Sequence, residues 1–245
     1  MKDYFQLCSS IFYWLLVAPF RGQMFSVSDT LRQMVRIGVQ ALPMACLTAF
    51  SIGLTLAMQA AREMGRLGAD AYVPDLVSLT LLRELGPMLI AVIVIGRSGS
   101  AVTAELGTMK VSEEIEALSI MAINPVRFLV IPRFIAMMVM LPVMTIIGNY
   151  VGMFGGWTIC HFTIDMDTAV YIFRCFDRGA PLDLFSGLIK SVVFAWLAIT
   201  IACHFGLTVE GGAEGVGRCT TNSVVYSLRS MLIANALLTA LFFYS

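Results

Sequence analysis

The chain has 245 residues, of which 58% are hydrophobic and only 13% are charged. This composition exceeds what the core of a soluble protein of this length requires, so most of its surface is expected to face lipid. The 16 Lys and Arg residues balance the 16 Asp and Glu residues, which provides no basic surface for nucleic acid and argues against a nucleic acid partner.

The first part of the chain, residues 1–35, predicts an interfacial helix region that lies along the membrane. The stretch from Tyr4 to Phe20 is uncharged, but it is shorter than the ~20 residues that a spanning helix needs. Polar residues such as Gln6 also interrupt its apolar stripe. A secretory signal is the alternative, which is disfavoured because Asp3 weakens the basic n-region and no A-x-A-like cleavage site follows.

Apolar runs dominate the rest of the chain, and several reach the length that crosses ~30 Å of hydrocarbon. Lipid offers no hydrogen bonds to the backbone, so spans of this composition must be helices. The chain is therefore expected to be an all-α integral membrane protein with a single domain over residues 1–245. The predicted membrane spans are 37–61, 76–96, 134–157, 184–209 and 224–244.

An odd number of spans places the termini on opposite sides of the membrane. With the N-terminus in the cytoplasm, ten of the 16 Lys and Arg residues are cytoplasmic, as the positive-inside rule favours. The C-terminus is then periplasmic, and residues 99–121 lie in the cytoplasm. The six basic residues on the other side are Arg62, Arg66, Arg83, Arg174, Arg178 and Lys190.

Charged and apolar residues alternate in the predicted cytoplasmic segment, residues 99–121. Its apolar residues include Val111, Ile115 and Leu118, and their i, i+4, i+7 spacing describes an amphipathic helix. Such a helix suits docking to a partner protein, with a solvated loop as the alternative. The charged residues that would couple the chain to this partner are Glu105, Lys110, Glu113, Glu114 and Glu116.

A new helix is expected to start just after this segment. Asn124 is a favoured N-cap residue, and Pro125 is favoured in the first turn of a helix. The helix that begins here leads into the third span.

Four stretches of sequence resemble one family. They are LLRELGPMLIAVIVIGRSGSAVTAELGTMKVSEEIEAL at Leu81 to Leu118, NPVRFLVIPRFIA, LIKSVVFA from Leu188, and GGAEGVGRCTTNSVV from Gly211 to Val225. The chain resembles the MlaE (YrbE) family, the permeases of MCE-associated ABC transporters. The resemblance implies one interfacial helix, five membrane helices and a cytoplasmic coupling helix, in agreement with the spans predicted above.

The same resemblance implies a set of partners in the bacterial inner membrane. They are a second copy of the chain, an ABC ATPase subunit, an MCE-domain protein, a small STAS-type cytoplasmic subunit and a phospholipid. ATP and Mg would be bound by the ATPase, because this chain has no G-x-x-x-x-G-K-[ST] motif. No cofactor and no catalytic residue is expected in the chain itself, since GRSGS is not a nucleophile elbow and its two histidines lie far apart.

Ionisable residues inside predicted spans are the main site candidates, because they are costly there and usually functional. Arg83 and Glu84 lie in the second span, and Lys190 lies in the fourth. If these three residues face a cavity between two protomers, Arg83 and Lys190 could hold a phospholipid head group while Glu84 orients Arg83. Alternatively, Arg83 and Glu84 pair with each other and snorkel at the end of a shorter helix. The family resemblance adds Leu56, Met64 and Leu85 as the apolar lining.

The third span carries Gly148, Gly152 and Gly156 at intervals of four residues. This spacing puts positions without a side chain on one helix face and permits close approach of another helix. Packing within the chain is favoured over a seam between two copies.

The leading hypothesis is a lipid permease driven by a separate ATPase, and two alternatives belong to other classes. An ion-coupled secondary transporter would use Arg83, Glu84 and Lys190 as a polar relay, although no inverted repeat is evident. A membrane anchor for an MCE protein would transport no substrate itself. The sequence also leaves open the lipid head group, the transport direction and whether Cys160 and Cys175 form a disulfide, and it predicts no metal site.

Overall fold

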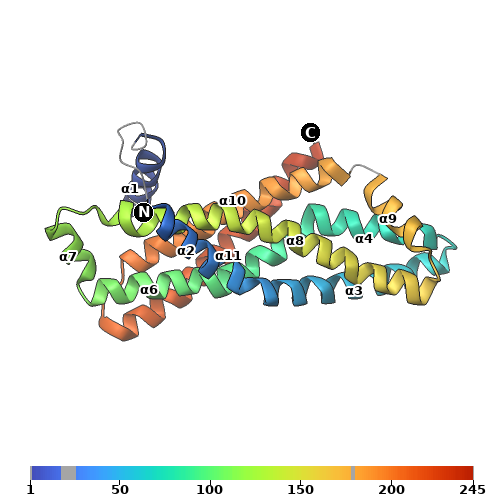
Figure 1. The fold of residues 1–245 in the computed structure, drawn as a ribbon, viewed down its shortest axis with the longest axis horizontal. Helices are drawn as coiled ribbons and strands as arrows, with labels where there is room; N and C mark the ends of the chain where they lie inside the picture. Colours follow the sequence, from blue (N-terminus) through green and yellow to red (C-terminus); the bar gives the residue numbers. More distant parts are fainter. Residues whose placement is uncertain (1, 18–25, 178–179, 245) are drawn as a thin grey trace. The chain divides into compact units, whose positions relative to one another are not determined.

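The structure is a computed structural model that describes residues 2–17, 26–177 and 180–244, and these residues form helices without a β-strand (Figure 1). Five helical runs are long and apolar enough to cross a membrane. The predicted all-α membrane fold is therefore confirmed. The runs are Val27–Arg66, Asp70–Val111, Val126–Ile164, Leu182–Leu207 and Gly212–Phe242.

The chain folds into two compact units, each assembled from separate stretches of sequence. Unit 1 comprises Met1–Ala41, Val94–Met140 and Val193–Ala240, and unit 2 comprises Leu42–Ile93, Leu141–Val192 and Leu241–Ser245. The α-helices are α1 (Lys2–Phe12), α2 (Val27–Ile37), α3 (Leu42–Arg66), α4 (Val73–Thr80), α5 (Gly86–Val94), α6 (Ser100–Val111), α7 (Glu114–Ile120), α8 (Ile131–Ile164), α9 (Thr168–Asp177), α10 (Ala180–Leu207) and α11 (Gly212–Tyr244). The α8 and α10 helices contribute residues to both units.

Small residues determine how the helices of unit 2 pack. The buried face of α3 consists of Ala45, Ala49, Gly53, Ala57 and Ala60, which lets another backbone come close. At the closest point, a Cβ atom added to Gly53 would lie only 1.8 Å from the carbonyl oxygen of Gly152 on α8. The two helices therefore touch backbone to backbone.

The three glycines predicted to share a face of α8 all meet neighbours within unit 2. A Cβ atom on Gly148 would lie 2.8 Å from Ile90 Cδ1, and one on Gly152 would lie 3.1 Å from Leu81 Cδ1. On Gly156 it would lie 2.9 Å from the hydroxyl oxygen of Tyr171. These glycines are thus enclosed by the chain's own side chains, those of α5, α9 and the helical run between α4 and α5.

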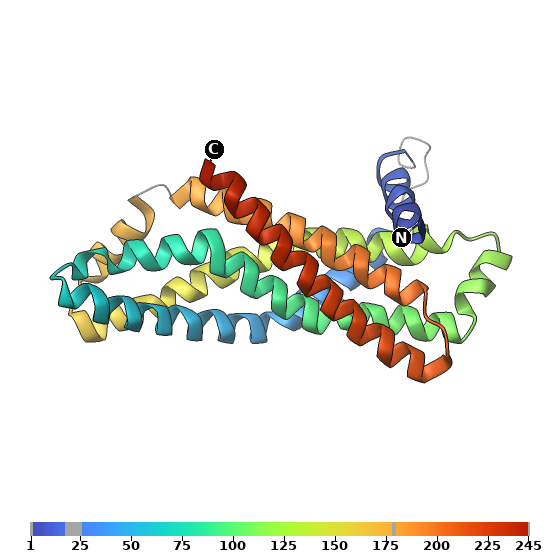
Figure 2. The ribbon, with the colours of Figure 1, turned by 180° about the vertical axis from the view of Figure 1, so that it is seen from behind.

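Hydrogen bonds between buried side chains join the helices of unit 1. The Thr103 hydroxyl of α6 lies 3.1 Å from the carbonyl oxygen of Ala202 on α10 and 2.8 Å from the hydroxyl of Ser223 on α11. Figure 2 shows the backbones of these helices from behind. The N-terminal helix is attached as well, since Tyr4 Oη lies 3.0 Å from Thr200 Oγ1. Thus α1 is anchored to α10 by a specific polar contact.

The predicted interfacial region, residues 1–35, forms two helices. The first, α1, ends in a π-helical turn at Tyr13–Val17, and residues 18–25 of the region lie outside the described residues. The Ser26 hydroxyl then accepts a hydrogen bond from the backbone N–H of Asp29 and caps α2. A short 3-10 turn at Val39–Ala41 connects α2 to α3, so the helical run of the first span begins well before predicted residue 37.

The helix predicted within residues 99–121 is present as α7, but it covers only the last part of that segment. The second span continues without a break through α6 to Val111, and a separate short helix, α7, begins at Glu114. Glu113 between them has a left-handed backbone, with φ of 60°, which cannot continue a right-handed helix. No Gly or Pro marks this break.

The helix start predicted at Asn124 is confirmed. The Asn124 side-chain oxygen accepts hydrogen bonds from the backbone N–H groups of Val126 at 2.9 Å and Arg127 at 3.4 Å. A π-helical turn at Val126–Val130 then leads into α8.

The helices extend beyond most of the predicted spans, because hydropathy detects only the part of a helix that suits hydrocarbon. The fourth span is an exception, since α10 ends at Leu207 and not at predicted residue 209. Two glycines with positive φ, Gly211 at 88° and Gly212 at 69°, form the turn that follows. The fifth helix starts at once after this turn, before predicted residue 224.

The contact between α3 and α8 predicts the effect of a small substitution. Gly53→Ala places a methyl group on the Gly152 carbonyl and forces the helices apart, which should destabilise the protein by about 1–3 kcal/mol or more. Gly217→Ala is the matched control, because an added Cβ there meets nothing within 4 Å. Thermal unfolding in detergent, followed by size-exclusion chromatography, should show a lower melting temperature for Gly53→Ala alone; equal melting temperatures would contradict the contact.

Candidate functional site

The second span contains an irregular turn at the position of the predicted charged residues. Leu81–Leu85 forms a π-helical turn, in which the backbone N–H of Gly86 bonds the carbonyl of Leu81. Turns of this kind often occur at functional sites. This one carries Arg83 and Glu84, two of the three predicted site residues.

Lys190 of α10 lies against this turn and is only 1% exposed. Its ammonium group donates hydrogen bonds to Glu84 Oε1 at 2.5 Å and to the carbonyl oxygen of Arg83 at 3.1 Å. Pro87, four residues after Arg83, has no N–H to offer this carbonyl. The buried ammonium thus takes the place of the missing helix donor.

Arg83 pairs with a residue that the sequence analysis missed. Its Nε atom lies 3.3 Å from Oδ1 of Asp183, which precedes Lys190 by two turns of α10. The i, i+7 spacing places Asp183 and Lys190 on one face of α10, and this spacing was the available signal. Asp183 lies just outside predicted span 184–209.

The alternative in which Arg83 and Glu84 pair with each other differs from the ion pairs in the structure. Consecutive residues of a helix point in different directions and do not face each other. Each therefore pairs with a different residue of α10: Glu84 with Lys190, and Arg83 with Asp183. The site consists of two ion pairs, and Arg83 has the more exposed cation, with 40% of its side chain accessible.

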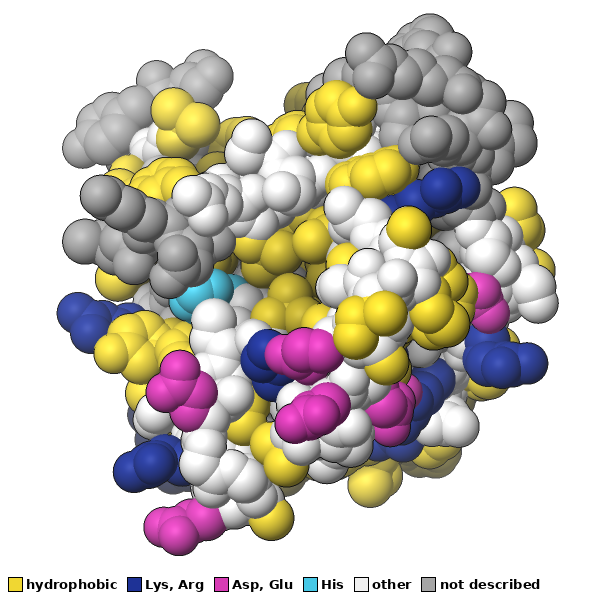
Figure 3. Space-filling view, turned by 90° about the vertical axis from the view of Figure 1, so that its left-hand side faces the viewer, with side chains coloured by type: hydrophobic (Ala, Val, Ile, Leu, Met, Phe, Trp, Pro, Cys, Tyr) yellow, Lys and Arg dark blue, Asp and Glu magenta, His cyan; other side chains and the backbone are white. Residues whose placement is uncertain are grey.

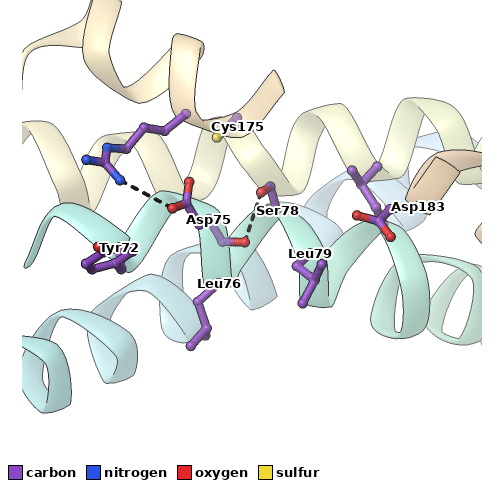
Figure 4. A pocket seen from close by; sticks show the side chains of 9 residues that line it. Tyr72, Asp75, Leu76, Ser78, Leu79, Cys175 and Asp183 are labelled. Carbon is purple, nitrogen blue, oxygen red and sulfur yellow. Dashed lines mark hydrogen bonds and ion pairs between the residues drawn. The ribbon is translucent and has the colours of Figure 1, made fainter. Parts of the chain in front are cut away.

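A cavity of about 290 Å³ lies between α4 and α9, next to Asp183 (Figure 4). An ion pair joins its walls, since Arg174 Nη1 of α9 lies 3.3 Å from Asp75 Oδ2 of α4. The same guanidinium group lies over the ring of Tyr72, 5.4 Å from its centroid. The lining residues are Tyr72, Asp75, Leu76, Ser78, Leu79, Leu82, Arg174, Cys175 and Asp183.

The α9 helix was not predicted from the sequence, although it encloses this cavity. It is held to α8 by Tyr171, whose hydroxyl donates a 2.8 Å hydrogen bond to the carbonyl of Met153. Cys160 and Cys175 lie in the same buried cluster as Tyr171, and both are free thiols. Burial raises the pKa of the Cys175 thiol to about 11, so this thiol is protonated at neutral pH.

The three predicted lining residues occupy the edge of the core of unit 2. Leu56, Met64 and Leu85 are each half-buried and pack against the buried cluster that includes Ala57 and Leu82. They come from α3 and the π-helical turn. In the single chain these residues therefore contribute to packing.

The residues predicted to couple the chain to an ATPase have different surroundings in unit 1. Glu105 lies 2.7 Å from Arg36 Nη1 and 3.2 Å from Nη2 of the buried Arg133, so it connects α2, α6 and α8. Lys110 forms an ion pair with Glu116, and the hydrogen bond that the Lys110 ammonium group donates lowers the pKa of the Glu116 carboxyl. These side chains hold the fold of unit 1 together.

The most exposed apolar residues of this region stand at the end of α7. Ile120 is 87% exposed and Met121 is 60% exposed, whereas Ile115 is buried. Glu113 and Glu114 lie at the other end of the short helix. Figure 3, which looks onto this end of unit 1, shows acidic and basic side chains interspersed with apolar ones.

Comparisons with known proteins give a consistent result. The family model described as "Permease MlaE" matches residues 30–241. A probable ABC transporter permease protein of Rickettsia prowazekii is 37% identical over 96% of this chain and 90% of its own length. One of Synechocystis is 38% identical over 96% and 93%. The chloroplastic protein TRIGALACTOSYLDIACYLGLYCEROL 1 of Arabidopsis thaliana is 36% identical over 88% of this chain and 61% of its own length.

The buried ion pair predicts a strong and non-additive effect on stability. Lys190→Met leaves the Glu84 carboxylate without its partner and should destabilise the protein by about 3–5 kcal/mol. The double variant Lys190→Met with Glu84→Gln should be less destabilised than the sum of the two single variants, because no charge is then left alone. Thermal unfolding of the four proteins measures this coupling.

Arg66→Gln is the matched control, because its ion pair with Glu63 is exposed. Its loss should cost less than about 1 kcal/mol. Additive effects at Lys190 and Glu84 would show that the two groups do not interact.

Proposed function

The chain belongs to the MlaE family of ABC transporter permeases, and we propose that the cargo it moves is a phospholipid or a related lipid. In this proposal a separate subunit binds ATP and Mg, and a second copy of the chain completes the membrane core. An MCE-domain protein exchanges lipid on the periplasmic side of the inner membrane, and a STAS-type subunit is a further cytoplasmic partner. The N-terminus is cytoplasmic and the C-terminus is periplasmic.

The observation that supports this proposal is the environment of the Arg83 side chain. Its guanidinium group lies within an apolar span and pairs with Asp183 through Nε, while 40% of the side chain stays accessible. The remaining N–H donors are half-exposed and suit a phosphate group, which arginine binds through two parallel hydrogen bonds. The head group of a membrane phospholipid provides such a phosphate.

Lys190 has a different role in this proposal. Its ammonium group is buried and already donates to two acceptors, so it is a positioning residue that holds Glu84 and the π-helical turn. Glu84, with 36% of its side chain accessible, can face an amine of the head group. The acyl chains would lie along Leu56, Met64 and Leu85 at the edge of the core.

One relative supports a diacyl lipid as the class of cargo. The name of the Arabidopsis protein, TRIGALACTOSYLDIACYLGLYCEROL 1, contains the name of a galactosylated diacylglycerol. Such a lipid has the same diacylglycerol backbone as a phospholipid and differs from it in the head group.

In this proposal the separate ATPase subunit docks on α7 and drives transport through this contact. Ile120 and Met121 are exposed apolar residues at one end of this helix, and Glu113 and Glu114 stand at the other. This arrangement suits an ATPase surface with an apolar groove and a basic rim. Glu105, Lys110 and Glu116, which pair within the chain, keep α6 and α7 in place for that contact.

Transport in the assembled complex tests the role of Arg83. Arg83→Gln removes a charged donor and should lower ATP-dependent transfer of fluorescent phospholipid between proteoliposomes and an acceptor by about tenfold or more. The ATPase should still co-purify with this variant. Arg66→Gln is the control and should transfer lipid normally.

Two outcomes would contradict the lipid permease proposal. Normal transfer by Arg83→Gln favours a membrane anchor that leaves lipid movement to other subunits. Gradient-driven transport by this chain alone, without an ATPase, favours an ion-coupled secondary transporter.

Association with the ATPase tests the role of α7. Ile120→Asp puts a charge into the proposed apolar contact and should weaken co-purification of the ATPase by about tenfold or more. Leu67→Asp is the control, because Leu67 is 75% exposed in the turn between α3 and α4. Glu113→Gln with Glu114→Gln separates the contribution of charge, and full ATPase recovery with Ile120→Asp would contradict this docking site.

A further inference from the structure

A second polar pocket lies in unit 2, where the C-terminal ends of α3 and α8 meet the start of the second span. Its volume is about 390 Å³. No residue of this pocket belongs to the site around Arg83. The lining residues are Met58, Ala61, Arg62, Asp70, Ile159, Thr163 and Ile164.

The pocket carries two charges for which the described residues provide no ion-pair partner. Arg62 makes no ion pair and no hydrogen bond with a described side chain, whereas every other described Lys or Arg of unit 2 has a carboxylate within 4 Å. Asp70 also lines the pocket but forms no ion pair with Arg62 among the described residues. A cation and a carboxylate thus face the same cavity without neutralising each other.

Polar and apolar residues follow one another in the order that a lipid requires. Met58 precedes Arg62 by one turn of α3, and Ile159 precedes Thr163 by one turn of α8. Beyond the pocket the chain becomes charged, with Glu63 directly after Arg62. The polar rim therefore lies where the helices leave the hydrocarbon, and the apolar wall lies one turn deeper.

We propose that this pocket binds a phospholipid whose head group carries both a phosphate and an amine. The phosphate lies on the Arg62 guanidinium and the Thr163 hydroxyl, and the ammonium group lies on the Asp70 carboxylate. An acyl chain follows Met58 and Ile159 into the membrane. Such a binding site does not depend on transport and goes beyond the proposed function.

The carboxylate is the reason for choosing a zwitterionic lipid. A purely anionic head group would gain the contact with Arg62, but it would bring a second negative group toward Asp70. An aminophospholipid satisfies both charges, in the same way that opposite charges across an interface select one partner over another. Arg62 should therefore control how much lipid is bound, and Asp70 should control which lipid is bound.

Native mass spectrometry of the purified chain tests this division of roles. Delipidated protein is incubated with an equimolar mixture of phosphatidylethanolamine and phosphatidylglycerol, and the retained lipid is counted. All variants are made in the Arg83→Gln background, so that lipid at the proposed transport site does not contribute. Arg62→Gln should retain about fivefold less of both lipids, and Asp70→Asn should lower the ethanolamine to glycerol ratio about threefold.

Arg66→Gln is the matched control, since Arg66 follows one turn later on α3, is exposed and pairs with Glu63. Equal melting temperatures establish that each variant is folded. Lipid retention by Arg62→Gln equal to that of Arg66→Gln would overturn the site, and an unchanged lipid ratio in Asp70→Asn would overturn the zwitterionic assignment. Neither result would affect transport through Arg83, which is measured separately by lipid transfer.

Discussion

The buried ammonium group of Lys190 is the interaction on which the rest of unit 2 depends. A charge inside a membrane span is costly unless it is paired, and two acceptors of Lys190, Glu84 Oε1 and the carbonyl oxygen of Arg83, belong to the π-helical turn at Leu81–Leu85. One is a carbonyl that Pro87 leaves without its usual helix donor. The lysine thereby fixes the path of the chain from α4 into α5, and this path sets the direction in which Arg83 points.

Close backbone contacts make this arrangement possible. Between helices in lipid there is no hydrophobic driving force, so packing relies on small residues and polar contacts. The contact of Gly53 with Gly152 brings α3 against α8, and Gly86 lies directly on the side-chain oxygen of Asn149, which an added Cβ would meet at 1.7 Å. Asn149 is 1% exposed, and its amide atoms have no hydrogen-bond partner among the described residues. The packing of α5 on α8 thus includes an unsatisfied polar group, which costs stability where the two helices meet.

The sequence could predict those features that depend on composition or on neighbouring residues. Apolar run length identified the spans, and Asn124 followed by Pro125 identified a helix start. The pairing of distant residues was out of reach: Asp183 is far from Arg83 in the chain, and Glu105 meets Arg36 and Arg133 from two other helices.

Local breaks and short helices were also missed, for a different reason. The change of direction at Glu113 uses a left-handed non-glycine residue, so no Gly or Pro marks it in the sequence. The α9 helix is too short to show as a span, and its position follows from the contacts of Arg174 with α4 and of Tyr171 with α8.

Depth explains which charges of unit 2 need a partner within the chain. Lys190 is buried and donates to acceptors within the chain, whereas Arg62 lies near the end of its helix, where water and lipid head groups replace a protein partner. Arg83 lies between these cases, because it is inside a span and yet 40% of its side chain is accessible. A guanidinium group in that state gains most from an anion that enters with the lipid, which is why we propose a binding role for Arg83 and a positioning role for Lys190.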